Sequence, residues 1–234
     1  MAKLRITRLG HGGILYRSPN DKWIWVDRWS GGPTYAAPPQ PWQVDVIAPT
    51  HGHFDHVGND AADVVDLAAL GGTVVCSHEM SVYLAGRAVE AIGMNKGGRV
   101  EAAGIGFSMV HADHTGGITI TGGAAEATRE VGCWGWILEF EDGTVVYHSG
   151  DTDLFGDMAL LRERWAPTIA VLPIGGHYTM GPADAARAVA LVGARTVIGV
   201  HYGTFPILAG TPAQLEAATD AQVVALEPGE TWEV

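Results

Sequence analysis

Short apolar runs that end in a histidine or an aspartate recur along this chain of 234 residues. Each run is rich in valine, isoleucine or aromatic residues, which predicts a buried strand that leads into a polar residue. The predicted strands are Trp23–Asp27, Val44–His51, Thr73–His78, Phe107–His114, Thr144–Asp151, Ile169–His177 and Thr196–His201. We therefore expect several polar side chains to gather where these strands end.

The segments between the runs predict helices. These helices span Val57–Leu70, about Glu79 to Ile92, and Pro182 to the stop at Gly193, and another opens at Thr211 and Pro212. Strands that alternate with helices indicate a layered α/β domain. The Asp-Gly turn within Phe140–Val146 predicts a hairpin, so part of the sheet must be antiparallel. The chain shows no internal repeat or low-complexity linker, and we expect one domain over residues 1–234.

Composition excludes several classes of protein. A chain that is 47% hydrophobic and 17% charged fits a well-cored globular protein rather than a disordered one. Its net charge of −12 would repel a phosphate backbone, so we expect no nucleic-acid partner. The N-terminus does not read as a signal peptide and no apolar run is long enough for a bilayer, which predicts a cytoplasmic protein without a membrane partner. Cys76 and Cys133 are expected to be reduced, partly buried thiols.

The densest polar segment is THGHFDH, residues 50–56. Alternate side chains of an extended stretch point the same way, so His51 and His53 can converge on one metal ion. Asp55 and His56 follow at the entry to a helix and can face a second ion. Histidines also cap helices or sit in a core, but so many polar groups at a buried strand end need a compensating partner.

Other strand ends supply the remaining ligands. The expected first set is His51, His53 and His114, the second is Asp55, His56 and His201, and Asp151 bridges the two ions. Such ions lie roughly 3.5–4 Å apart in dinuclear sites. Nitrogen and oxygen ligands favour Zn²⁺, with Mn²⁺, Co²⁺ and Fe²⁺ as alternatives.

The motif THGHFDH resembles the signature of the metallo-β-lactamase superfamily. The stretches LGHGG, HSGDTDLFGDM, LPIGGHYTMGPADAA and VHYGTFPIL resemble its small metal-dependent hydrolases related to ascorbate-6-phosphate lactonase. The resemblance implies a four-layer αββα sandwich with two metal ions at one edge, supports all seven ligands, and is compatible with a homo-oligomer. Arg28 departs from the pattern, because relatives usually have proline after the residue that matches Asp27.

The expected mechanism follows from the chemistry of the ions. A bound water has its pKa lowered from about 15.7 toward 7, and the resulting bridging hydroxide would attack a small-molecule ester, lactone, amide or phosphate ester. Asp55 would orient that water and carry a proton toward the leaving group. His177 is expected to contact substrate, to donate a proton or to support a ligand from outside. Asp27 could accept a hydrogen bond from a ligand histidine, and His11 either borders the site or supports its turn.

Several weaker assignments complete the expectations. Tyr178 and Tyr202 are candidates for oxyanion contacts, although packing is the more common role of such tyrosines. The loops Arg28–Gln43 and Thr115–Gly132 would select the substrate. Their only basic residues are Arg28 and Arg129, which gives weak support to a phosphorylated substrate.

The alternative functions are a phosphodiesterase or nuclease and a metal-binding sensor without turnover. Nuclease relatives usually carry an added domain for which this chain has neither the length nor the charge. The presence of all seven ligands disfavours the sensor. A redox di-iron role is less favoured, since it typically comes with a fused flavin domain.

Overall fold

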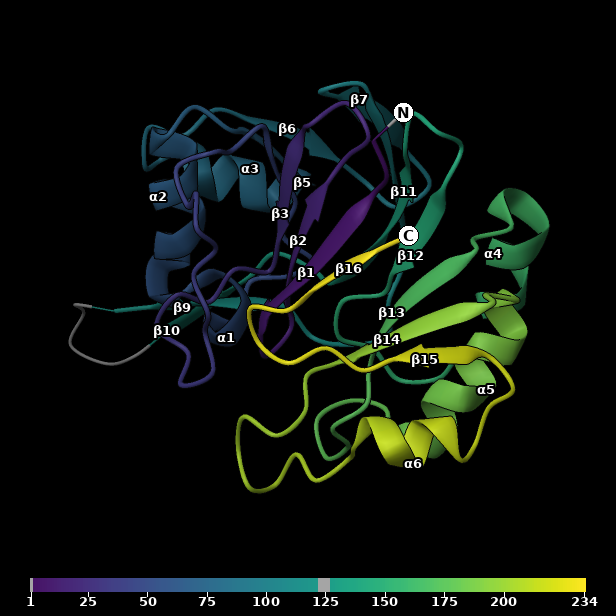
Figure 1. Ribbon diagram of the computed structural model, residues 1–234. Coiled ribbons are helices and arrows are strands. Elements are labelled where there is room, and N and C mark those ends of the chain that lie inside the picture. Colours follow the sequence, from purple (N-terminus) through teal and green to yellow (C-terminus); the bar gives the residue numbers. More distant parts are fainter. Residues whose placement is uncertain (1, 122–126) are drawn as a thin grey trace.

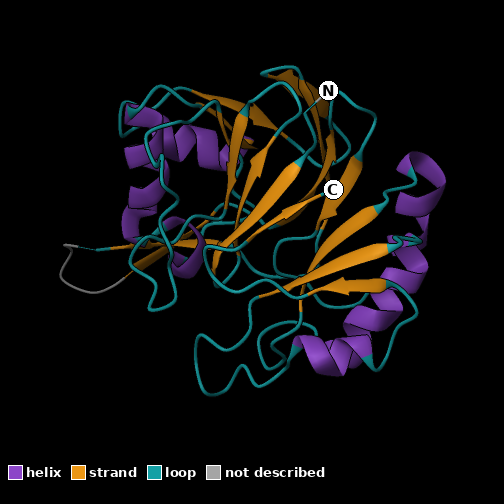
Figure 2. Cartoon of the chain, in the orientation of Figure 1, coloured by secondary structure: helices purple, strands orange, loops and turns teal. Residues whose placement is uncertain are grey.

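Two seven-stranded sheets face each other and carry helices on their outer faces (Figures 1 and 2). The computed structural model describes residues 2–121 and 127–234. Helices α2 and α3 cover one sheet, and α4, α5 and α6 cover the other (Figure 1). The chain is thus an αββα sandwich, as the resemblance to the metallo-β-lactamase superfamily implied.

The first sheet has the strand order β16-β1-β2-β3-β4-β5-β6. Its strands are β1 (Arg5–Gly10), β2 (Gly13–Arg17), β3 (Trp23–Val26), β4 (Val46–Ile47), β5 (Thr73–Ser77), β6 (Ala91–Met94) and β16 (Thr231–Glu233). Strands β16, β1, β2 and β3 pair antiparallel, and β3 to β6 pair parallel. Its helices are α2 (Ala62–Ala69) and α3 (His78–Ala85), which follow α1 (Phe54–Val57) and the short 3-10 helix Asn59–Ala61.

The second sheet has the order β15-β14-β13-β12-β11-β8-β7. Its strands are β7 (Arg99–Ala102), β8 (Ile105–His111), β11 (Trp134–Glu139), β12 (Val145–His148), β13 (Ile169–Pro173), β14 (Thr196–Val200) and β15 (Gln222–Val224). Its helices are α4 (Met158–Trp165), α5 (Pro182–Val192) and α6 (Pro212–Glu216). Strands β12 to β15 run parallel, and β8 runs in the same direction because β11 is antiparallel to both β8 and β12.

The main core lies between the two sheets. Buried side chains from both sheets meet there, among them Trp25 from β3 and Phe107 and Trp136 from β8 and β11. A second cluster, with Tyr147 and Leu172 among its members, packs the second sheet against α4 and α5. Both cysteines are free thiols, as expected, and they are fully buried rather than partly buried. Within residues 2–121 and 127–234, no helix has the length and hydropathy to cross a bilayer.

Local signals predicted the C-terminal half well. Helix α5 begins at Pro182 and ends at Val192, with Gly193 as a left-handed cap at φ 74°. Helix α6 follows Thr211, whose side chain forms a capping box with Gln214. Strands β11 and β12 form the antiparallel hairpin expected at the Asp-Gly turn.

Two predicted helices are wrong in extent. The helix expected over Val57–Leu70 is broken, because Gly58, Asp60 and Ala61 take φ values of 73°, 58° and 56° that end one helix before α2 begins. The helix expected over Glu79 to Ile92 ends at Ala85, and Ala91–Met94 instead pair with β5 as the edge strand β6. Tertiary pairing outweighs local helix propensity there.

The predicted loop Thr115–Gly132 contains a hairpin. Strands β9 (Gly117–Ile120) and β10 (Ala127–Glu130) pair antiparallel, while residues 122–126 of that segment lie outside the described residues. The predicted strand Val44–His51 reduces to the two residues of β4, after which Pro49 and Thr50 lead out of the sheet. The segment Arg28–Gln43 carries no helix or strand, as expected of a loop.

Candidate metal centre

The candidate site lies at one edge of the sandwich, where the carboxyl ends of several strands meet. Asp27 follows β3, His51 follows β4 and His201 follows β14, and Asp151 and His114 come three residues after β12 and β8. The loop that bears His51 is fixed to the second sheet, since Trp134 N donates to Thr50 O at 2.9 Å and Trp136 Nε1 to Pro49 O at 3.0 Å. Strand ends from both sheets thus meet at one edge of the sandwich.

The first ligand group consists of His51, His53 and His114. Each offers a ring nitrogen, and the three nitrogens lie within 4.8 Å of one another. His51 Nε2 lies 3.0 Å from His53 Nδ1. His51 is buried, whereas His53 and His114 are partly exposed. Imidazole nitrogens that converge in this way suit a single divalent cation.

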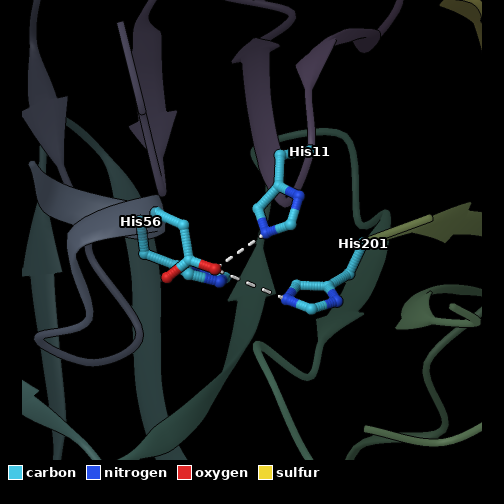
Figure 3. Close-up of side chains that lie close together, drawn as sticks. His11, His56 and His201 are labelled. Carbon is cyan, nitrogen blue, oxygen red and sulfur yellow. Dashed lines mark hydrogen bonds and ion pairs between the residues drawn. The ribbon is translucent and has the colours of Figure 1, made fainter. Parts of the chain in front are cut away.

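The second ligand group consists of Asp55, His56, His201 and, in addition, His11. One ligand atom of each lies within 4.8 Å of the others. His11 Nε2 lies 3.0 Å from Asp55 Oδ2, and His201 Nε2 lies 3.9 Å from the same oxygen. Figure 3 shows His11, His56 and His201 pointing toward one another from separate segments of the chain. This group mixes nitrogen with carboxylate oxygen.

The carboxylate of Asp151 stands between the two groups. Its Oδ2 lies 3.1 Å from Nε2 of His201 and 3.4 Å from Nε2 of His56 in the second group. The same oxygen lies 3.7 Å from Nε2 of His114 and 3.9 Å from Nε2 of His51 in the first group. One buried carboxylate oxygen therefore lies within 4 Å of a ring nitrogen from each of four histidines.

The electrostatics of the cluster favour bound cations. Burial would raise the pKa of Asp151, but His201 and His56 outweigh it and hold that pKa well below its usual range. The pKa of Asp55 is also lowered, against burial, by the hydrogen bond from His11 and the charge of His56. Burial lowers the pKa of His51 and His114, which keeps both imidazoles neutral and able to donate a lone pair.

His56 differs from the other histidines of the cluster. Burial acts to lower its pKa, but Asp151 and Asp27 hold the pKa well above its usual value. Its Nε2 and Nδ1 of His201 are buried, and neither nitrogen has a hydrogen-bond partner among the residues that the structure describes. Buried nitrogens that lack hydrogen-bond partners cost free energy unless a bound cation accepts their lone pairs. The residues present therefore fit divalent metal ions.

Asp27 and Thr50 support both groups from behind. Asp27 accepts hydrogen bonds from Thr50 N at 2.8 Å and from Thr50 Oγ1 at 2.6 Å, and its Oδ2 lies 3.0 Å from His56 Nδ1. Because the Thr50 hydroxyl donates to Asp27, it can accept from His51 Nδ1, which lies 3.0 Å away. That arrangement leaves Nε2 of His51 free to bind a metal. Sequence reasoning assigned Asp27 to such contacts but did not single out Thr50.

His11 reaches the site from the turn between β1 and β2. Its Nδ1 lies 2.8 Å from Thr204 Oγ1, and its backbone O accepts from His201 N at 2.9 Å. The residue is buried and holds a left-handed φ of 39°. Gly12 allows the close approach, because a Cβ there would lie 2.7 Å from His56 Cε1. The signal in the sequence was the histidine flanked by glycines in LGHGG.

His177 is exposed in the loop after β13, and its ring packs against Tyr178 with centroids 4.4 Å apart. Among the described residues, it belongs to neither ligand group. The hydroxyl of Tyr202 accepts a hydrogen bond from Arg8 at 2.7 Å, and the Arg8 guanidinium stacks on the ring of Tyr202. Both the hydroxyl and the ring of Tyr202 thus contact Arg8. The roles predicted for His177 and Tyr178 stay predictions.

Comparison with known proteins agrees with this geometry. A model of the β-lactamase superfamily domain matches residues 22–202. A UPF0173 metal-dependent hydrolase of Herpetosiphon aurantiacus is 42% identical over 243 residues. The alignment covers 99% of this chain and 98% of that protein. The structure of Igni18, a metallo hydrolase of Ignicoccus hospitalis, superposes with a TM-score of 0.83 at 31% identity, covering all of this chain and 99% of that one.

A more distant likeness supports the fold alone. The metallo-β-lactamase fold protein YhfI of Bacillus subtilis shares 14% identity, with a TM-score of 0.72 over 99% of this chain and 100% of that one. Taken with the strand-end cluster of histidines and aspartates, these matches identify the family. The chain belongs to the metallo-β-lactamase superfamily and, within it, to the UPF0173 metal-dependent hydrolases.

Proposed function

We propose that this protein binds two divalent metal ions and hydrolyses a small-molecule ester, lactone, amide or phosphate ester. The observation that carries the proposal is the position of Asp151 Oδ2, 3.1–3.9 Å from Nε2 of four histidines that belong to two separate groups. A carboxylate in that position can bridge two cations. The proposed ligands are His51, His53 and His114 for one ion, Asp55, His56 and His201 for the other, and Asp151 for both.

Divalent ions at this site would activate a water molecule at neutral pH and polarise the oxygen of a carbonyl or phosphoryl group. The chain's own residues would position the reactants. Asp55 keeps an ionised carboxylate because His11 donates to its Oδ2 at 3.0 Å. Its other oxygen would accept a hydrogen bond from the attacking water and later carry a proton toward the leaving group. His177, on the exposed loop after β13, would contact the substrate or supply a proton.

The donor set favours Zn²⁺, with Mn²⁺ as the alternative. Five of the seven proposed ligands are imidazoles, which suit zinc, and the two carboxylates also admit a harder ion. The cytoplasmic location, expected from the N-terminal sequence and the hydropathy, stays a prediction. The homo-oligomer, suggested by the resemblance to this family, also stays a prediction.

The test is a panel of lactones, thioesters, carboxylic esters, β-lactams and phosphodiesters, offered to protein loaded with Zn²⁺ or with Mn²⁺. We expect turnover of one carboxylic or phosphate class, with two equivalents of metal bound, and a loss of at least about 100-fold in Asp151→Ala. Phosphodiesters as the only substrates would favour the phosphodiesterase alternative. Silence across the panel from protein that holds two metal ions would favour a sensor.

A further inference from the structure

Three aromatic side chains form a continuous surface beside the candidate site, which we call the aromatic wall: Trp29, Phe54 and Phe205. The ring of Trp29 meets that of Phe54 edge to face, with centroids 5.6 Å apart, and lies 6.1 Å from that of Phe205. Phe54 is 42% exposed, and the other two are partly exposed. Large aromatic rings that stay open to solvent beside a reactive centre are available to a ligand.

The aromatic wall is continuous with the second ligand group. The ring of His11 packs against Trp29 at 5.4 Å and against Phe205 at 5.8 Å. The same imidazole donates to Asp55 Oδ2 at 3.0 Å. Phe54 itself stands in the chain between His53 and Asp55. A substrate held at the metal centre would therefore place one of its substituents against these rings.

Both basic residues of the loops that would select a substrate contact other side chains of the protein. Arg28 Nε lies 3.6 Å from Asp63 Oδ1 and 3.4 Å from Tyr35 Oη. The guanidinium of Arg129 lies over the ring of Tyr83, 5.8 Å from its centroid. These are the two basic residues of the loops that would select a substrate, and both have partners within the protein. The surroundings of the aromatic wall thus favour an uncharged substituent over a phosphate.

We propose that the aromatic wall is the subsite for an uncharged aromatic or bulky apolar substituent of the substrate. This inference rests on the proposed hydrolase function and narrows it to esters, lactones or amides that bear such a group. The ring of the ligand would lie against Phe54 and Trp29, where it leaves water and gains edge-to-face contacts. Phe205 supports Trp29 from the side of His11.

The experiment compares two probes that share a metal-binding group, benzohydroxamate and acetohydroxamate, by isothermal titration calorimetry on metal-loaded protein. We expect wild type to bind benzohydroxamate about tenfold more tightly, since burial of one phenyl ring supplies a factor of that order. Phe54→Ala and Phe205→Ala should bring this affinity ratio toward one, and Phe54→Leu should keep part of it. Leu160→Ala is the control, because Leu160 is an exposed apolar side chain (48%) on α4, outside the aromatic wall and both substrate-selecting loops, and this variant should keep the full ratio.

Metal content and circular dichroism of each variant separate a change in the subsite from a failure to fold. Equal affinity of wild type for the two probes, or an unchanged ratio in Phe54→Ala protein that holds its metal, would overturn the proposal. A wild-type protein that holds metal and prefers benzohydroxamate, yet hydrolyses nothing, would contradict the hydrolase function and leave the subsite standing. Protein that takes up no metal and binds neither probe would overturn both.

Discussion

The two ligand groups differ in how firmly the protein holds them. In the first group, His53 and His114 are partly exposed, and the closest nitrogen to His53 Nδ1 is another candidate ligand, His51 Nε2 at 3.0 Å. In the second group, His56 and His201 are buried. That group is also tied together by His11, which bonds to Asp55 and to the backbone of His201.

The difference implies a division of labour at the site. Rigid, desolvated ligands bind a metal ion tightly because little ordering remains to be done on binding. Partly exposed ligands leave room for water and substrate. We therefore expect the second group to hold the tighter ion and the first group to hold the ion that exchanges more readily and faces the substrate.

The largest expected effect comes from removing one ligand of each group in turn. His53→Ala should lose the ion of the first group and His201→Ala that of the second, each with at least about a 100-fold fall in affinity at that position. Metal content after dialysis would show about one equivalent in each variant. If both variants lost both ions, the groups would not be independent and the comparison would fail.

A smaller effect, common to both groups, is expected at Asp27. Its carboxylate contacts His56 directly and His51 through Thr50, so Asp27→Ala should weaken both ions by about 10- to 100-fold. Competition with a chelator would measure the two affinities. Weakening confined to the second group would show that the path through Thr50 contributes nothing.

His11→Asn should sharpen the contrast. Asparagine tolerates the left-handed φ of 39° at this position but is too short to reach Asp55 Oδ2, so only the second ion should weaken, by about tenfold. The same chelator competition applies, with Thr204→Val as the companion variant for the other end of the imidazole. Equal weakening of both ions would mean that His11 acts on the whole cluster.

Much of this site was predictable because strand ends carry it. The short runs before His51, Asp151 and His201 each indicated a strand, and the sandwich brings those ends together. The sequence left the role of His11 undecided, because its contact with Asp55 joins two residues that stand 44 positions apart in the chain. The roles of His51, Asp151 and His201 as metal ligands stay predictions.

The departures in the fold have two causes. Strands β6, β9 and β10 form by pairing with strands that the local sequence does not predict as partners. The kink after Val57 needs a positive φ at three of the four residues 58–61, and Asp60 and Ala61 give little sign of it. Helix caps and an Asp-Gly turn, by contrast, act within a few residues, and these were predicted correctly.

The smallest effect on the site is expected from His148, a buried histidine outside both ligand groups. His148 Nδ1 lies 2.8 Å from Tyr16 Oη between the sheets, and burial lowers its pKa to about 4. The unfolded value is about 6.5, so the folded state excludes a proton that the unfolded state binds, and stability is lost as pH falls from about 6.5 to 4. In metal-free protein, His148→Gln should flatten this dependence by up to about 1.4 kcal/mol per pH unit.

Urea unfolding at several pH values would measure that slope. The contrast with His56 makes the comparison useful: both imidazoles are buried, but two carboxylates raise the pKa of His56. A slope unchanged in His148→Gln would show that His148 titrates normally, and the distinction between the two environments would be lost.

The pairing of β1 with β16 has a consequence for how the chain reaches its native state. Arg5 and Glu233 are bonded although they stand 228 residues apart, and Val234 N donates to Leu4 O at 3.0 Å. During synthesis one edge of β1 must therefore stay unpaired until the residues of β16, such as Glu233, have been made. Contacts of such long range slow folding, so the nascent chain exposes a strand edge until β16 emerges and would benefit from a chaperone that covers it.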